Sequence, residues 1–183
     1  MHIEPKPIES YPWYARMLFK KQKKKLGMVL LPGLFWARMP LLHILFTFFW
    51  KYFDRKSSEL DPVLRSLVQV RVAQINWCKF CIDFNSVLLM ERCDASDKID
   101  QLSDWSKSEL FSDLERAALE YTETLSSTEV EVDPALMARL KKHLGDDQIV
   151  ELTALISFQN MSAKFNAALA IPSQGMCKIP PKN

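Results

Sequence analysis

Glycine is scarce in this sequence, with 4 residues among 183. Sheets joined by tight turns need more glycine, because hairpin turns use backbone conformations that glycine adopts with the least strain. The sequence also lacks the alternation of apolar and polar residues that is typical of strands. Apolar residues make up 48% of the chain, enough for a substantial core, and they recur at helical spacing. These observations predict an all-α protein.

A secretory signal peptide and a membrane-spanning segment are also lacking. Residues 1–14 contain prolines and glutamates where a signal peptide has its apolar core. The best candidate for a membrane span, Met39 to Trp50, has 12 residues, whereas a spanning helix needs about 18 or more. We therefore expect a cytoplasmic protein.

Charge is nearly balanced, with a net +2, but it is unevenly distributed. Residues 1–56 hold 11 Lys and Arg against 3 Asp and Glu, and Lys20–Lys25 form the run KKQKKK. We interpret this run as the solvated end of a helix, because such runs are common on surfaces. Contact with an anionic membrane surface is a less favoured alternative. No basic face with interleaved aromatic residues is present, so we expect no nucleic-acid partner.

Four cysteines are present, two of them three residues apart. Cys78 and Cys81 form a CxxC motif, whereas Cys93 and Cys177 are isolated in the sequence. A structural zinc site needs four ligands, and no second CxxC or paired-histidine motif follows, so we expect no metal and no other cofactor. Two interpretations remain: a redox-active dithiol, typical of a CxxC without a secretory context, or two small apolar residues in a core. On a helix the two side chains would share a face, at a separation that a disulfide can bridge.

Helix boundaries are marked at several points. Asp61, Ser112 and Asp133 are expected N-caps. Asp61 and Asp133 are followed by proline at the first helical position, and Ser112 is followed by Glu115 in a capping box. Gly145 is expected to end the helix that Asp133 begins.

The two ends of the chain carry the most apolar helices. We expect a short N-terminal helix that ends at Pro32–Gly33, then an apolar helix over residues 34–56 that Pro40 either kinks or begins. The last helix, from Asp147 to about Leu169, is apolar on nearly every side. It is therefore expected to be buried, partly against another subunit.

Three stretches, RSLVQVRVAQINWCKFCIDFNS, LFSDLERAALEYTETL and QIVELTALISFQNMSAKFNAALAIP, resemble the carboxymuconolactone decarboxylase family, in particular its AhpD-like alkylhydroperoxidases. They lie in order within residues 59–172. The resemblance implies an all-α, AhpD-like helical domain that forms homo-oligomers, often trimers or hexamers. It also implies that Cys81 attacks a hydroperoxide, that Cys78 resolves the product as a disulfide, and that a dithiol reductant protein restores the thiols.

The resemblance also suggests how the chain is divided. We predict a basic and apolar helical arm over residues 1–56, the AhpD-like domain over 57–172 and a C-terminal tail over 173–183.

The sequence departs from the family pattern at two positions. Active members carry a histidine four residues after the second cysteine and a glutamate twelve residues before the first, and these positions are Asn85 and Ser66 here. Neither side chain is a base near neutral pH, so the proton relay of the family is absent. Asn85 lies one turn from Cys81, where it would donate a hydrogen bond to a thiolate.

Other groups are candidates for activating the thiol. Arg71 lies seven residues before Cys78, near one helical face, and His43 and Glu91 are candidates only if the fold brings them close. Asn76 is either the N-cap of a new helix, whose free N–H groups would favour a thiolate, or part of one continuous helix.

Three functions are therefore open. An antioxidant thiol oxidoreductase that reduces hydroperoxides through a CxxC dithiol–disulfide cycle is favoured. A redox-sensing or non-enzymatic helical oligomer with a degenerate relay is the alternative, and lactone decarboxylation comes last, because no matching residues are found.

Four polar or aromatic residues near these stretches have a structural interpretation. Trp77 and Phe80 alternate with the cysteines and either shape an apolar pocket around the sulfurs or fill the core, and core filling is favoured. Asn160 and Asn166 interrupt the apolar last helix, and similar asparagines recur in the family. We expect them to form hydrogen bonds inside the oligomer.

Overall fold

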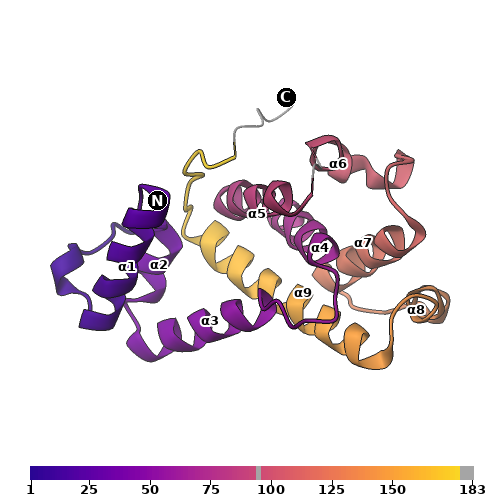
Figure 1. Cartoon of the computed structure of the whole chain (residues 1–183), viewed down its shortest axis with the longest axis horizontal. Coiled ribbons are helices and arrows are strands. Elements are labelled where there is room, and N and C mark those ends of the chain that lie inside the picture. The colour runs from indigo at the N-terminus through magenta and orange to yellow at the C-terminus, as the bar shows by residue number, and fades with distance from the viewer. Residues whose placement is uncertain (94–95, 178–183) are drawn as a thin grey trace.

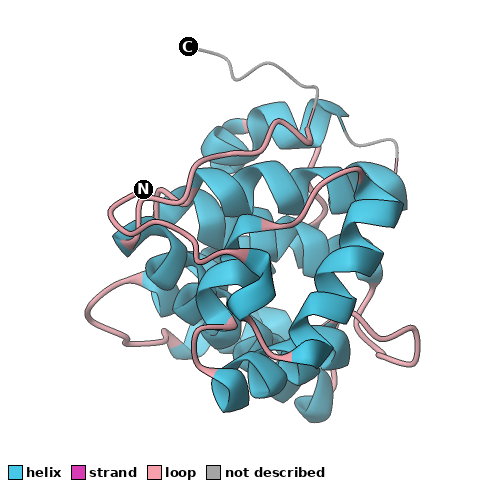
Figure 2. Cartoon of the chain, turned by 90° about the vertical axis from the view of Figure 1, so that its left-hand side faces the viewer, coloured by secondary structure: helices cyan, strands magenta, loops and turns pink. Residues whose placement is uncertain are grey.

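The computed structural model describes residues 1–93 and 96–177, and within these ranges the protein is built from helices without a strand (Figure 2). The α-helices are α1 (Trp13–Leu26), α2 (Leu31–Trp36), α3 (Pro40–Phe53), α4 (Pro62–Ile75), α5 (Lys79–Arg92), α6 (Ser96–Gln101), α7 (Asp113–Ser126), α8 (Pro134–Lys141) and α9 (Asp146–Ala168). Two 3₁₀ helices, η1 (Ile8–Ser10) and η2 (Leu102–Lys107), complete the set. The all-α prediction is confirmed.

The three predicted N-caps are confirmed by side-chain hydrogen bonds. The Asp61 carboxylate accepts from two N–H groups of the first turn of α4, and Asp133 accepts from the N–H of Ala135 at 2.8 Å. Ser112 and Glu115 form the expected capping box at the start of α7. These caps satisfy N–H groups that have no partner within the helix.

Two predicted helix ends were wrong. Gly145 does not end α8, which stops at Lys141; it is the N-cap of α9, with φ of −70°, and its N–H donates to the Gln148 side chain at 2.9 Å. A glycine is tolerated at an N-cap, and Gln148 supplies the acceptor of a capping box. The N-terminal helix α1 ends at Gly27, in the left-handed conformation, whereas Pro32–Gly33 lie inside α2, because proline is tolerated in a first helical turn.

The helix α4 is at the centre of the fold and packs against α5, α7 and α9 (Figure 1). It is buried over most of its length, from Leu64 to Ala73. The main apolar core contains residues of these helices and of α8, together with Phe35 of α2 and both cysteines of the CxxC motif. The CxxC motif therefore lies inside the protein rather than on its surface.

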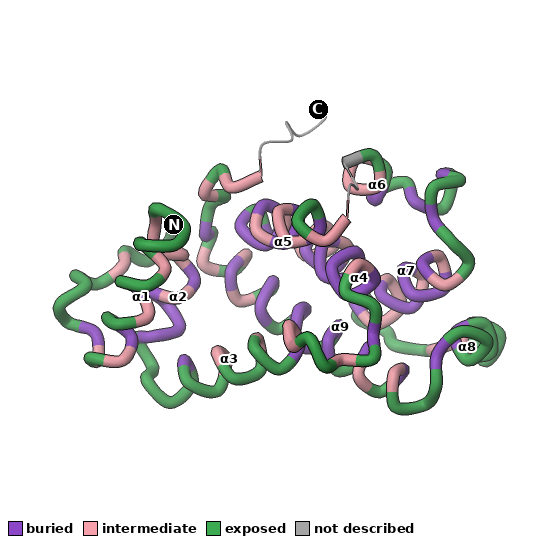
Figure 3. The backbone as a smooth tube through the Cα atoms, in the orientation of Figure 1, coloured by how far each residue is buried: buried purple, intermediate pink, exposed green. Residues whose placement is uncertain are grey.

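The helices α1 and α2 lie at one end of the molecule, and α3 runs from them along its lower edge (Figure 1). Pro40 begins α3, so of the two alternatives for this proline a helix start is confirmed. Most residues of α3 are exposed, as the green colour of this helix in Figure 3 shows. Its exposed large apolar residues are Leu41, Leu42, Ile44, Leu45, Phe48, Phe49 and Tyr52. In the described part of the chain, no helix has the length and apolarity to cross a bilayer.

Candidate redox site

The CxxC motif lies at a sharp break between α4 and α5. The N–H of Trp77 donates to the carbonyl of Gln74 at 3.1 Å, and the N–H of Cys78 donates to the carbonyl of Ala73 at 3.0 Å. These two bonds form a Schellman motif, which places Trp77 in the left-handed region with φ of 53°. Glycine is usual at this position, and a tryptophan there is strained. Trp77 is also 86% exposed, so the prediction that it fills the core was wrong.

The break places Cys78 at the N-cap of α5. The Cys78 Sγ accepts a hydrogen bond from the N–H of Cys81 at 3.2 Å, one of the free N–H groups of the first turn. Both alternatives for Asn76 were wrong, because it caps the C-terminus of α4 instead. A sulfur at a helix N-terminus is stabilised as a thiolate by the N–H groups and the helix dipole.

Cys78 and Cys81 are joined by a disulfide, with their Cα atoms 5.2 Å apart. Both residues are almost fully enclosed, with 1% and 3% of their surface exposed. The side chains of Phe80 and Phe84, on the same helix, stack on each other. The structure thus shows the pair in its oxidised form within an apolar, partly aromatic environment.

A side chain from α9 contacts the second sulfur. The Nδ2 of Asn166 donates to the Sγ of Cys81 at 3.3 Å, and Asn166 is only 2% exposed. Its Oδ1 is buried without a hydrogen-bond partner among the described residues. Asn160 instead bonds to Asn76 and Ser126. Both asparagines therefore form hydrogen bonds within one chain, although the Oδ1 of Asn166 is left without a partner among the described residues.

The two positions that depart from the family pattern are buried. Asn85 lies on α5 one turn after Cys81, and in residues 1–93 and 96–177 no hydrogen bond joins its side chain to either sulfur. The hydroxyl of Ser66 accepts from Arg92 at 2.7 Å. Arg92 also forms an ion pair with Asp54. The glutamate position of the family is thus occupied by a neutral hydroxyl that accepts a hydrogen bond from a guanidinium. This hydroxyl cannot act as a base.

The other candidate groups are engaged elsewhere. Arg71 forms an ion pair with Glu123 of α7, with 2.6 Å between Nη2 and Oε1, so its charge is already compensated. His43 lies between the rings of Tyr14 and Phe19, and burial lowers its pKa below the usual range. Glu91 lies ten residues beyond Cys81 on the same helix, which is about 15 Å along its axis.

Asp83, two residues after Cys81, anchors the C-terminal segment. Its carboxylate accepts from the hydroxyl of Ser173 and from the N–H groups of Gln174, Met176 and Cys177. Burial alone would raise the pKa of Asp83, but these hydrogen bonds outweigh it and hold the pKa below its usual range. Sequence reasoning missed Asp83, because its partners are some 90 residues away in the chain.

Gln174 extends this anchor to the N-terminal part of the chain. Its side chain accepts from the N–H of Leu31 at 2.9 Å and donates to the carbonyl of Val29 at 3.0 Å. The residues before and within α2 are thus tied, through the tail, to the helix that carries both cysteines.

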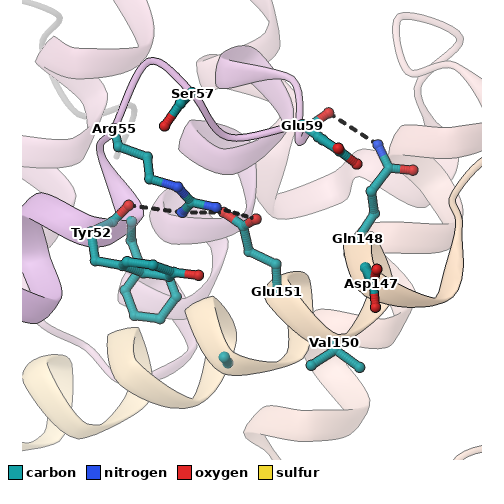
Figure 4. A pocket seen from close by; sticks show the side chains of 10 residues that line it. Tyr52, Arg55, Ser57, Glu59, Asp147, Gln148, Val150 and Glu151 are labelled. Atoms are coloured by element: carbon teal, nitrogen blue, oxygen red, sulfur yellow. Dashed lines mark hydrogen bonds and ion pairs between the residues drawn. The ribbon is translucent and has the colours of Figure 1, made fainter.

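A separate pocket of about 350 Å³ lies between the loop after α3 and the start of α9 (Figure 4). Arg55 crosses it to form a bidentate ion pair with Glu151, and Gln148 donates to the carbonyl of Glu59. No cysteine lines this pocket, and its main cation is already paired. Within the residues that the structure describes, no group of three or more His, Cys, Asp or Glu side chains is arranged to hold a metal ion.

Known proteins share both the sequence and the fold. The carboxymuconolactone decarboxylase family matches residues 40–124. The protein named Uncharacterized protein YnjA, from Escherichia coli (strain K12), is 46% identical over 176 residues, which cover 96% of this chain and 97% of that protein. This chain belongs to the carboxymuconolactone decarboxylase family. The resemblance of its motifs to this family is thereby confirmed.

Two solved structures share the fold of this chain. The AhpD core of an uncharacterized peroxidase-related protein from Ralstonia eutropha JMP134 has a TM-score of 0.86 and 19% identity, over 99% of this chain and 97% of that one. The debrominase Bmp8 has a TM-score of 0.80 and 18% identity, over 94% and 91%. At such low identity they establish the fold alone, which is AhpD-like over nearly the whole chain.

Proposed function

We propose that this family member is an antioxidant thiol oxidoreductase that reduces hydroperoxides through the Cys78–Cys81 pair. One observation carries the proposal: the two cysteines form a disulfide at the first turn of α5, where one sulfur caps the helix and the other accepts from a buried amide. Cysteines that only fill a core require neither a position at a helix N-cap nor a hydrogen bond from a buried amide. We further propose a cytoplasmic location, where dithiol proteins keep such pairs reduced.

The proposed dithiol–disulfide cycle has three steps. The Cys81 thiolate attacks a peroxide oxygen, the O–O bond breaks, and the sulfur becomes a sulfenic acid while the alkoxide takes a proton to give the alcohol. The Cys78 thiolate then attacks that sulfur, forming the disulfide and releasing hydroxide, which takes a proton from solvent to leave as water. A dithiol reductant protein supplies two electrons through a mixed disulfide and restores both thiols.

The environment determines how fast this cycle can run. The family's carboxylate and histidine are replaced by Ser66 and Asn85, and neither of these two side chains can take the thiol proton and return it to the leaving alkoxide. The N-terminus of α5 still favours a thiolate. We therefore expect hydroperoxide turnover to be slower than it would be with the carboxylate and histidine of the relay in place.

The burial of both sulfurs favours a second candidate function, redox sensing. A protein reductant must reach the sulfurs of two residues that are 1% and 3% exposed, which requires the surrounding segments to move. A pair that oxidises readily but is reduced slowly would report on peroxide rather than remove it.

The test is to count thiols during oxidation. In a Cys93→Ser/Cys177→Ser background, the reduced protein is treated with hydrogen peroxide or an alkyl hydroperoxide. We expect two thiols to be lost for each hydroperoxide reduced, with the disulfide located by mass spectrometry. Sustained turnover with a dithiol reductant supports the peroxidase, and oxidation without turnover supports the sensor. Thiols that stay unreacted would refute both.

The exposed apolar face of α3 leads to a second proposal, that the chain forms a homo-oligomer, a trimer or hexamer. Leu41 and Phe48, two turns apart on this helix, are 70% and 65% exposed, and a contiguous apolar face of this kind is unusual on a monomer. We propose no nucleic-acid partner and do not favour membrane-surface contact.

Charges on this face should separate the subunits. In a Leu41→Glu/Phe48→Glu variant, two apolar contacts per chain would be replaced by buried charges, and we expect the affinity between subunits to fall by roughly 1,000-fold. Light scattering after size exclusion measures the mass. Val130→Glu, at another exposed apolar residue, is the control and should not change it. A wild-type chain that runs as a monomer would refute the oligomer.

A further inference from the structure

We infer that Asn166 is a positioning residue that holds the Cys81 sulfur as an oriented thiolate, in the role for which the sequence singles out Asn85. The inference rests on the proposed function, because it concerns how the same cysteine is made reactive. It follows from the geometry of one amide group.

The contact between Asn166 and Cys81 suits the reduced state better than the oxidised one. The Nδ2 can only donate, and it lies 3.3 Å from the Cys81 Sγ. A disulfide sulfur is a weak acceptor, whereas a thiolate is charged and accepts a stronger hydrogen bond. Reduction followed by loss of the thiol proton would therefore strengthen a contact that is already in place.

Asn160 shows what a purely structural asparagine looks like on the same helix. Its Oδ1 accepts from Asn76 at 2.8 Å, and its Nδ2 donates to Ser126 at 2.9 Å. Asn166 is buried more deeply, yet its Oδ1 has no partner within the described residues. An unpartnered buried oxygen destabilises the folded state, so folding alone does not account for this amide.

The surroundings offer Cys81 no other polarising side chain in the described ranges. Asn85 makes no hydrogen bond to the sulfur, and Arg71 is paired with Glu123. The N–H of Cys81 itself is used by the Cys78 sulfur. Asn166 is thus the side chain that contacts the sulfur expected to attack the hydroperoxide.

The test measures the thiol pKa of Cys81 alone. In a Cys78→Ser/Cys93→Ser/Cys177→Ser background, the rate of alkylation by iodoacetamide is followed against pH, with folding checked by circular dichroism. Asn166→Leu removes the donor at nearly constant volume and should raise the pKa by about one unit, which lowers the alkylation rate at neutral pH about tenfold. Asn166→Asp places a negative charge beside the sulfur and should raise the pKa further.

Asn85→Leu is the matched control, because it removes a buried amide one turn from Cys81 on α5 and should leave the pKa of Cys81 unchanged. Should Asn166→Leu fail to fold, Asn166→Ala, which also removes the donor without adding a charge, carries the same comparison. If Asn166 had only a structural role, Asn166→Leu would change the melting temperature but would leave the pKa of Cys81 the same as in the parent protein. An unchanged pKa in the Asn166 variants, or a shift in Asn85→Leu alone, would overturn the inference.

The failure of the inference is distinguishable from failure of the proposed function. Unchanged pKa values would leave hydroperoxide turnover by the wild-type protein intact. Absence of thiol oxidation in the wild-type protein would instead refute the function, while the alkylation profile would still report on Asn166.

Discussion

Replacing Cys81 with serine should reduce hydroperoxide consumption to the uncatalysed background, a loss of at least about 1,000-fold, because a serine hydroxyl is neither ionised nor readily oxidised near neutral pH. Cys78→Ser should behave differently. It should consume one hydroperoxide per chain, accumulate a sulfenic acid at Cys81 and then stop, because no thiol remains to form the disulfide. Peroxide consumption and trapping of the sulfenic acid by a dimedone reagent measure the two effects.

The structure makes this pair of variants informative, because the two sulfurs have different polar contacts among the residues that the structure describes. The Cys78 sulfur accepts from a helix N–H and the Cys81 sulfur accepts from Asn166. Should the roles be reversed, Cys78→Ser would abolish the first reaction and Cys81→Ser would accumulate the sulfenic acid. Cys93→Ser and Cys177→Ser, at the two cysteines outside the motif, are the controls and should retain full activity.

Asp83→Asn should lower the free energy of unfolding by about 2–4 kcal/mol at neutral pH, because a buried carboxylate loses its charge while four donors still face it. Urea denaturation measures the change. The tail should also become susceptible to limited proteolysis, since Ser173–Cys177 are held through this carboxylate. The exposed Asp104, changed to asparagine, is the matched control and should have little effect.

The pH dependence of stability follows from the same group. The folded pKa of Asp83 lies below its unfolded value, so its stabilisation is fully present above the unfolded pKa of about 4 and is lost as pH falls through the folded pKa. Wild-type stability should therefore decline below about pH 4, and Asp83→Asn should remove part of that decline. A variant with an unchanged acid profile would contradict this account of the tail.

Local sequence determined much of the fold. The N-caps Asp61, Ser112 and Asp133 act through atoms two or three residues away, so the pattern of residues is enough to predict them. Gly145 shows the limit of such patterns, since a glycine between two helices suits the end of one or the start of the next. The choice depended on Gln148, which caps the second helix.

Local sequence was also enough to find the two cysteines, but not to describe their environment. The CxxC spacing and its flanking residues predict a redox pair, and the replacement of the family's histidine and glutamate is visible at Asn85 and Ser66. The sequence left open whether α4 continues through the motif. The helix breaks at Trp77, which adopts the left-handed conformation, and the sequence has no glycine there to indicate the break.

Only the tertiary structure decided which side chains meet the sulfurs. Asn166 lies 85 residues from Cys81 and reaches it because α9 packs beside α5, whereas Asn85, one turn away, makes no such contact. Asp83 likewise finds its donors in the tail. By itself the sequence determined the helices, the CxxC pair and the missing relay, since these depend on neighbours in the chain. The packing of distant helices determined the polar contacts of the pair, because a hydrogen bond depends on distances in space that residue order does not specify.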